Sequence, residues 1–253
     1  MCAWSLEPLL TEVAAWHVFD ANARIGHSGL HGELALEAPE LLLEMDRFGI
    51  ERALVSHFAG EEYDAEEGNR ALAHVARARL VPAWSGLPDR ESLDQLATRR
   101  PAAVRLHFGM TRHNFSPALW CSGELYAYLQ DHSVLTLVAL EDIGWPALVE
   151  VLDNFPKLAI LLLETGYRAD RYLFPLLGKF PNLYFDASTY VAHRQMETYV
   201  QRFGPERIVF GSRLPLYTPG ASLFVLGTAR ISDDARLAIA SLNLHRLLKG
   251  ATA

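Results

Sequence analysis

The chain has 253 residues, of which 50% are hydrophobic and 21% are charged, a composition typical of one large globular domain. Its 30 acidic and 23 basic residues give a net charge of −7, which argues against a nucleic-acid partner because phosphate binding needs a basic face. The two cysteines lie far apart, and no apolar run approaches the ~20 residues of a membrane helix. Because no Lys or Arg precedes Arg24, a signal peptide is not predicted, and we expect a cytoplasmic protein without a membrane partner.

Eight apolar runs of strand length recur along the chain, most of them followed by a helix-like segment. Strands are predicted at residues 17–21, 52–56, 80–84, 103–107, 134–140, 158–163, 183–185 and 207–210. Helices are predicted near residues 37–48, 64–78, 90–98, 117–131, 145–154, 169–179, 193–203, 220–228 and 232–248, with a short amphipathic lead-in over residues 1–15. The runs are continuously apolar, as in a parallel sheet covered on both faces. This layout predicts an α/β fold, a single-domain (β/α)8 TIM barrel over residues 1–253.

Local signals refine this prediction. A doubly wound open sheet is the rival fold, but the first strand leads into DANARIG, which is not the Gly-rich dinucleotide fingerprint. Gly49 is a plausible cap for the helix before it. The acidic run at residues 61–67 is interpreted as the solvated start of the next helix, because carboxylates favour a helix N-terminus.

Polar residues gather where the predicted strands end. The stretch HVFDANARIG, residues 17–26, brings Asp20, Asn22 and Arg24 onto one face of the first strand by alternation. The carboxyl ends of barrel strands converge on one site. The candidate residues at these ends are Asn22, Arg24, His57, Trp84, Arg105, His107, Glu164, Asp186 and Arg213. His57 and Asp186 are interpreted as structural.

Five sequence segments, in the same order as in one protein family, carry a resemblance to that family. They are FDANARIG after the first strand, NFPKLAILLLETG around the sixth, KFPNLYFDAS at the seventh, RFGPERIVFGSRLP at the eighth and ISDDARLAIASLNLHRLL at the end. Together they resemble the amidohydrolase-related TIM-barrel family, which includes metal-dependent decarboxylases and hydrolases of carboxylated rings. The resemblance covers nearly the whole chain and implies a TIM barrel, a carboxylated substrate and a dimer.

The sequence departs from this family at the metal site. The family pattern D-x-H-x-H keeps its Asp as Asp20, but Asn22 and Arg24 replace the histidines; the fifth strand lacks the expected His. Glu164 stands where the family often has His in H-x-G, and Arg213 replaces the Asp of F-G-S-D-x-P. Arginine offers only donors and stays charged. At about 4 Å and an effective dielectric near 20, each unit of charge product costs about 4 kcal/mol, so no catalytic metal and no cofactor are predicted.

The replacement residues suggest anion chemistry. Arg24, Arg105 and Arg213 form a potential guanidinium cluster that, with Asn22, would bind a carboxylate or phosphate. His107 is the candidate general acid or base. Glu164 is its partner, a second base, or the counter-ion of the arginines.

Two alternatives to this anion-binding interpretation stay open. In the first, Arg24 and Arg213 would form structural ion pairs with Asp20 and Glu164 and fill a pocket that has no catalytic activity. His27, His31 and His113, in loops above the mouth, would form a replacement metal site, although no ligand spacing supports it.

Two functional hypotheses follow. The first is a metal-independent hydrolase or C–C lyase, or a binding barrel, for a small anionic, carboxylated compound. The second is a catalytically inactive pseudoenzyme that serves as a subunit or scaffold, as a homodimer or as a heteromer with a related barrel.

Overall fold

The structure is a computed structural model that describes residues 7–32, 34–75, 78–109 and 112–250. Its strands are β1 (Val18–His27), β2 (Ala35–Leu36), β3 (Ile50–His57), β4 (Leu80–Pro82), β5 (Trp84–Gly86), β6 (Ala103–Leu106), β7 (Leu135–Ala139), β8 (Ile160–Leu163), β9 (Leu183–Asp186) and β10 (Ile208–Val209). Its helices are α1 (Glu7–Ala14), α2 (Ala38–Phe48), α3 (Phe58–Glu62), α4 (Ala65–Ala73), α5 (Arg90–Arg99), α6 (Leu119–Asp131), α7 (Leu140–Asn154), α8 (Asp170–Lys179), α9 (Gln195–Phe203), α10 (Pro219–Thr228), α11 (Asp233–Leu237), the π-helix η1 (Ala238–Leu242) and α12 (Asn243–Gly250).

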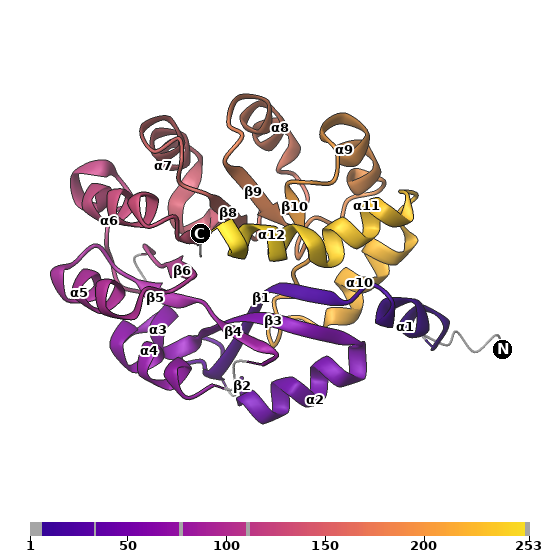
Figure 1. Cartoon of the computed structure of the whole chain (residues 1–253), viewed down its shortest axis with the longest axis horizontal. Coiled ribbons are helices and arrows are strands. Elements are labelled where there is room, and N and C mark those ends of the chain that lie inside the picture. Colours follow the sequence, from indigo (N-terminus) through magenta and orange to yellow (C-terminus); the bar gives the residue numbers. More distant parts are fainter. Residues whose placement is uncertain (1–6, 33, 76–77, 110–111, 251–253) are drawn as a thin grey trace.

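The strands form the predicted parallel barrel, built from two ladders. One has the order β2-β1-β3-β4 and the other β10-β9-β8-β7-β6-β5, and within both only β2 runs antiparallel to its neighbour. The ladders meet on one side where the Ala21 N–H donates to the Phe210 carbonyl at 2.9 Å. On the other side the chain itself runs from β4 into β5. Figure 1 shows the helices α5 to α9 around the outside of the ring.

The predicted strand over residues 80–84 is the pair β4 and β5. β4 ends at Pro82, which pairs with Val55 of β3, and β5 begins at Trp84, which pairs with Val104 of β6. Between the two strands the Ala83 N–H donates to the Val55 carbonyl at 2.8 Å, so the chain passes from one ladder to the other at Ala83.

Side chains fill the barrel interior, and α12 closes one end of it. Phe19, Leu54, Leu137 and Leu161 form one buried cluster together with Leu244 of α12. In Figure 1 this helix crosses in front of the ring. Because α12 packs beside Phe19, near the start of β1, it covers the end where the strands begin. The opposite end, where the strands finish, is the mouth.

The helix ends agree with the sequence in part. Gly49 follows α2 with φ +68°, as the cap prediction requires, and Asp64 caps α4 by accepting from the Glu67 N–H at 2.9 Å. The prediction of a solvated acidic start is wrong for Glu61 and Glu62. Both lie in the five-residue helix α3, between β3 and α4, and are buried.

Among the described residues, no helix has both the length and the apolar character needed to cross a bilayer.

Candidate functional site

The mouth is built first of all on Asp20, at the bulged part of β1. Its carboxylate accepts hydrogen bonds from the Asn22 N–H at 3.0 Å, the Ser212 N–H at 2.9 Å and the Ser212 hydroxyl. Burial raises the pKa of Asp20 to about 6, although the Ser212 hydroxyl and both N–H groups oppose that shift. Asp20 therefore ties β1 to the loop after β10 and is a structural residue.

Glu164, directly after β8, is the centre of a guanidinium cluster. Its Oε1 atom accepts from Arg24 Nη2 at 2.6 Å, from Arg105 Nη2 at 3.4 Å and from Asn22 Nδ2 at 3.3 Å. Its Oε2 atom pairs with Arg213 Nη2 at 2.8 Å. The structure thus brings together the four predicted substrate-binding residues around one predicted catalytic residue.

A second carboxylate, Glu61 of α3, holds the same arginines from the other side. Its oxygens lie 2.7 Å from Arg24 Nε, 3.7 Å from Arg105 Nη2 and 3.0 Å from Arg112 Nη1. Arg112 also pairs with Asp142, in the first turn of α7, at 3.0 Å. Glu61, Arg112 and Asp142 are not among the site residues predicted from the sequence, because nothing local in the acidic run marks Glu61 as buried.

Asn22 lies between Arg24 and Arg105 and holds both guanidinium groups in place. The Asn22 Oδ1 atom accepts from Arg24 Nη1 at 3.2 Å and from Arg105 Nη1 at 3.0 Å. Its amide nitrogen donates to Asp186 at 3.0 Å, and Asp186 in turn accepts from the Glu164 N–H at 2.8 Å. Asp186 is therefore a support for the cluster, in agreement with its predicted structural role.

Electrostatics keep the two glutamates ionised. Burial alone would raise the pKa of Glu164, but Arg24, Arg105 and Arg213 outweigh it and lower that pKa to about 2. Burial is likewise outweighed at Glu61, whose pKa lies well below its usual range because of Arg105 and Arg24. Neither carboxylate carries a proton near neutral pH, so the geometry makes Glu164 a counter-ion rather than a proton donor.

His107 lies beside this cluster, completely buried. Burial holds its pKa well below the usual range, so its imidazole is neutral at neutral pH. Its Nε2 atom lies 3.5 Å from the Ser85 hydroxyl, and its Nδ1 atom has no hydrogen-bond partner among the described residues. The His113 ring lies 6.2 Å away and contacts the Gly60 carbonyl through Nε2.

Other strand-end candidates have local roles. The His57 Nδ1 atom accepts from the Ala59 N–H at 3.1 Å and so caps α3, in agreement with its predicted structural role. Trp84 packs under the guanidinium of Arg99, with 4.5 Å between the Arg99 Cζ atom and the ring centroid. The alternative in which Arg24 and Arg213 pair with Asp20 and Glu164 is confirmed for Glu164, which pairs with both arginines, and wrong for Asp20, because the ionic partners of Arg24 are Glu61 and Glu164.

The donor set does not fit a divalent metal. Within the described ranges, no group of three or more His, Cys, Asp or Glu side chains is arranged to hold an ion, and this holds for the loop histidines His27, His31 and His113 as well. The oxygens of Glu61 and Glu164 face guanidinium groups, which repel a cation and cannot donate a lone pair.

Comparisons with solved structures place the fold among related barrels. An uncharacterised TIM-barrel protein from Bordetella bronchiseptica is 18% identical with a TM-score of 0.76, over 93% of this chain and 99% of that one. A 2,6-dihydroxybenzoate decarboxylase with its bound substrate is 14% identical, with a TM-score of 0.71 over 92% and 99% of the two chains. A manganese-bound 5-carboxyvanillate decarboxylase from Novosphingobium aromaticivorans is 10% identical, with a TM-score of 0.72 over 92% and 97%.

The sequence itself matches one family model. No curated protein matches the chain. The model described as amidohydrolase matches residues 32–250, which is most of the chain and begins after β1. The protein is therefore a member of the amidohydrolase family.

Proposed function

We propose that this protein is a metal-independent amidohydrolase-family barrel that binds a small carboxylated compound at its mouth and acts on it as a hydrolase or C–C lyase. One observation carries the proposal. Three guanidinium groups and the Asn22 amide converge on a single carboxylate, that of Glu164. Arginine forks match carboxylate geometry, so this arrangement is suited to recognise an anion of the same kind.

Arg213 is the contact point for such a ligand. Its side chain is 19% exposed, whereas those of Arg24 and Arg105 are 1% exposed. Its Nη2 atom pairs with Glu164, and its Nε atom has no partner among the described residues. It also stacks on the exposed ring of Tyr217, with 4.8 Å between the Arg213 Cζ atom and the ring centroid. For a carboxylate attached to an aromatic ring, Arg213 would therefore bind the carboxylate and Tyr217 would contact the ring.

The solved relatives support this substrate class. Two of them are named for decarboxylation of 2,6-dihydroxybenzoate and 5-carboxyvanillate, both carboxylated rings. In this chain the fixed charges of the arginines would hold the carboxylate. In hydrolysis the neutral imidazole of His107 would accept a proton from the attacking water and return it to the leaving group. Glu164 would compensate the guanidinium charge between turnovers.

A thermal-shift titration tests the binding step. At about 100 times the dissociation constant, benzoate or 2,6-dihydroxybenzoate should add about 2.7 kcal/mol and raise the midpoint by roughly 5–10 °C. Benzamide, which has the same ring without the charge, should not. Arg213→Gln should remove the shift, whereas Arg47→Gln, an exposed arginine on α2, should keep it.

The catalytic step has its own readout. A compound that binds should be converted by the wild type, with products followed by NMR. His107→Asn should abolish conversion and preserve the thermal shift. Unchanged conversion in that variant would remove His107 from the mechanism.

A second function, the pseudoenzyme subunit, is favoured by one observation. Arg24 and Arg105 are fully buried, and Glu61 and Glu164 already neutralise them, so the cluster is also suited to a purely structural role. In that case no carboxylate would raise the midpoint, Arg213→Gln would lower it, and size-exclusion chromatography should find a homodimer or a complex with a related barrel.

A further inference from the structure

A cavity of about 450 Å³ lies at the barrel end opposite the mouth, near the starts of β3, β4 and β6. Three arginines line it: Arg52 on β3, Arg99 at the end of α5, and Arg100 directly after it. The remaining walls are hydrocarbon, including Pro82 and Pro101, and no acidic side chain lines the cavity.

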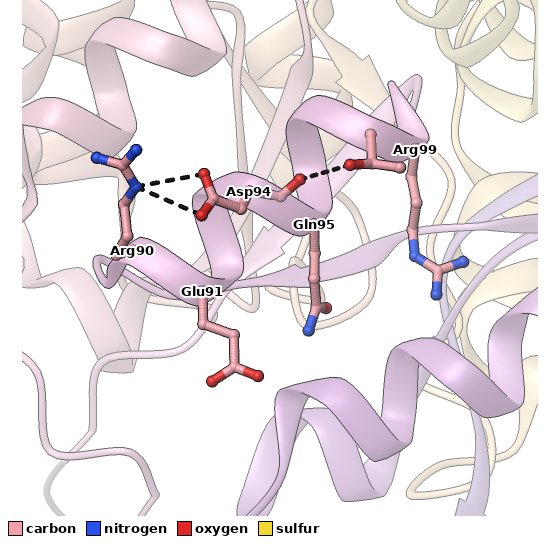
Figure 2. A pocket seen from close by; sticks show the side chains of 6 residues that line it. Arg90, Glu91, Asp94, Gln95 and Arg99 are labelled. Atoms are coloured by element: carbon pink, nitrogen blue, oxygen red, sulfur yellow. Dashed lines mark hydrogen bonds and ion pairs between the residues drawn. The ribbon is translucent and has the colours of Figure 1, made fainter.

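These guanidinium groups are unpaired. Within the described ranges, Arg52, Arg99 and Arg100 make no side-chain hydrogen bond and no ion pair, and the Nε atom of Arg52 is buried without a partner. Buried N–H groups in proteins are normally satisfied, so this atom calls for an acceptor. Arg90, at the other end of the same helix, differs: Figure 2 shows its guanidinium held by Asp94, whereas among the residues drawn no hydrogen bond or ion pair reaches the Arg99 guanidinium.

Two of the arginines are held in place by aromatic rings. The Arg52 Cζ atom lies 4.7 Å from the Phe19 centroid, and the Arg99 Cζ atom lies 4.5 Å from that of Trp84. A ring contact occupies the flat face of a guanidinium group and leaves its N–H edges free. The groups are therefore positioned while their donors remain available to an oxyanion.

Positive charge is concentrated here in a chain whose net charge is −7. Burial, and then the charges of Arg52 and Lys249, lower the pKa of the neighbouring His245 on α12. Glu51, next to Arg52 in sequence, has its carboxylate 2.6 Å from His17 Nδ1. The local charge thus lacks an internal counter-ion in the cavity wall.

We propose that this cavity is a binding site for a small, multiply charged oxyanion, such as a diphosphate or a polycarboxylate. Three guanidinium groups offer paired donors that match phosphate and carboxylate oxygens. The site lies at the opposite end of the barrel from Arg213 and is independent of the function proposed for the mouth.

Isothermal titration calorimetry at low ionic strength tests the site, with inorganic pyrophosphate and citrate as separate probes. The wild type should bind at least one of them, and the double variant Arg99→Gln, Arg100→Gln should bind it at least about tenfold more weakly, because two charge-assisted contacts are lost. Arg90→Gln is the control: it removes one positive charge from the other end of α5 and lies outside the cavity. Arg213→Gln separates this site from the mouth.

Each outcome decides the proposal. Binding of pyrophosphate alone identifies a phosphorylated ligand, and binding of citrate alone identifies a carboxylated one. Equal affinities in the wild type and the double variant would overturn the site, as would equal weakening in Arg90→Gln, which would indicate nonspecific ionic attraction. Absence of binding by either probe would overturn it too. Loss of binding only in Arg213→Gln would move the anion to the mouth.

Discussion

At the scale of single residues, Glu164 and Arg213 combine charge with an unusual backbone. Both have left-handed conformations, with φ values of +60° and +59°, and their side chains form a 2.8 Å ion pair. This region costs a non-glycine residue roughly 1–2 kcal/mol, and such residues cluster at functional sites. The barrel therefore holds two unfavourable backbone conformations at the position where we propose that a carboxylate binds.

The depressed pKa of Glu164 predicts a pH-dependent loss of stability. The folded chain has this pKa at about 2, against an ordinary value of 4.5, so between these values the unfolded chain binds more protons. The contribution of the charge is complete above about pH 4.5 and is lost as the pH falls toward 2. When complete, the contribution of the Glu164 charge to the free energy of unfolding is about 3 kcal/mol.

Urea unfolding of the wild type and Glu164→Gln from pH 7 to pH 3 measures this effect. The variant should have a lower free energy of unfolding than the wild type at pH 7, and this difference should narrow below pH 4.5. Glu66→Gln, which removes an exposed partner of Arg70, should show almost no gap at any pH. A gap for Glu164→Gln of constant size down to pH 3 would contradict the assigned charge state.

At the scale of elements, α3 is held against α4 by two glycines. A Cβ atom added at Gly68 would meet the Gly60 N atom and lie 2.5 Å from its Cα atom. This close approach positions α3, and with it Glu61, over the mouth.

Gly68→Ala should therefore destabilise the protein by about 1–3 kcal/mol, even though alanine favours a helix. Gly178→Ala is the matched control on α8, because a Cβ atom there meets nothing within 4 Å. That variant should be neutral or stabilised by up to about 1 kcal/mol. Urea midpoints for both variants test the prediction, and equal midpoints would show that the two helices can move apart freely.

The same elements explain how far the sequence could predict the site. Apolar runs followed by helical segments were sufficient for the barrel. Position at a predicted strand end was sufficient to place Asn22, Arg24, Arg105 and Arg213 in one cluster, although β1 continues through Asn22 and Arg24 to His27. Glu61 has no such signal. It lies in a five-residue helix within an acidic run, and it is buried only because three arginines from distant segments meet it. Pairing of this kind depends on tertiary structure.

At the scale of the whole molecule, the barrel interior is completed by the last helix of the chain. Leu244 and Leu247 of α12 are buried in the cluster that contains Phe19 and Leu137. The first and last parts of the chain thus share one core, and unfolding of one end should unfold the other.

Leu244→Ala should cost about 2–5 kcal/mol, because it leaves a cavity in that cluster. Unfolding should remain a single transition by circular dichroism and by tryptophan fluorescence, with a lower midpoint. Leu242→Ala, at a position 52% exposed, should change the midpoint little. Separate transitions in the Leu244 variant would show that α12 is an independent unit.

The buried arginines also bear on how the mouth acquires its charge. A site that depends on an ion must be loaded after synthesis, and its content follows the supply of that ion. Arg24 and Arg105 are part of the polypeptide, and Arg24 keeps its proton because Glu61 and Glu164 raise its pKa despite burial. The guanidinium groups of this mouth are therefore in place as soon as the chain has folded, and under the proposed function we expect chelators to leave ligand binding unchanged.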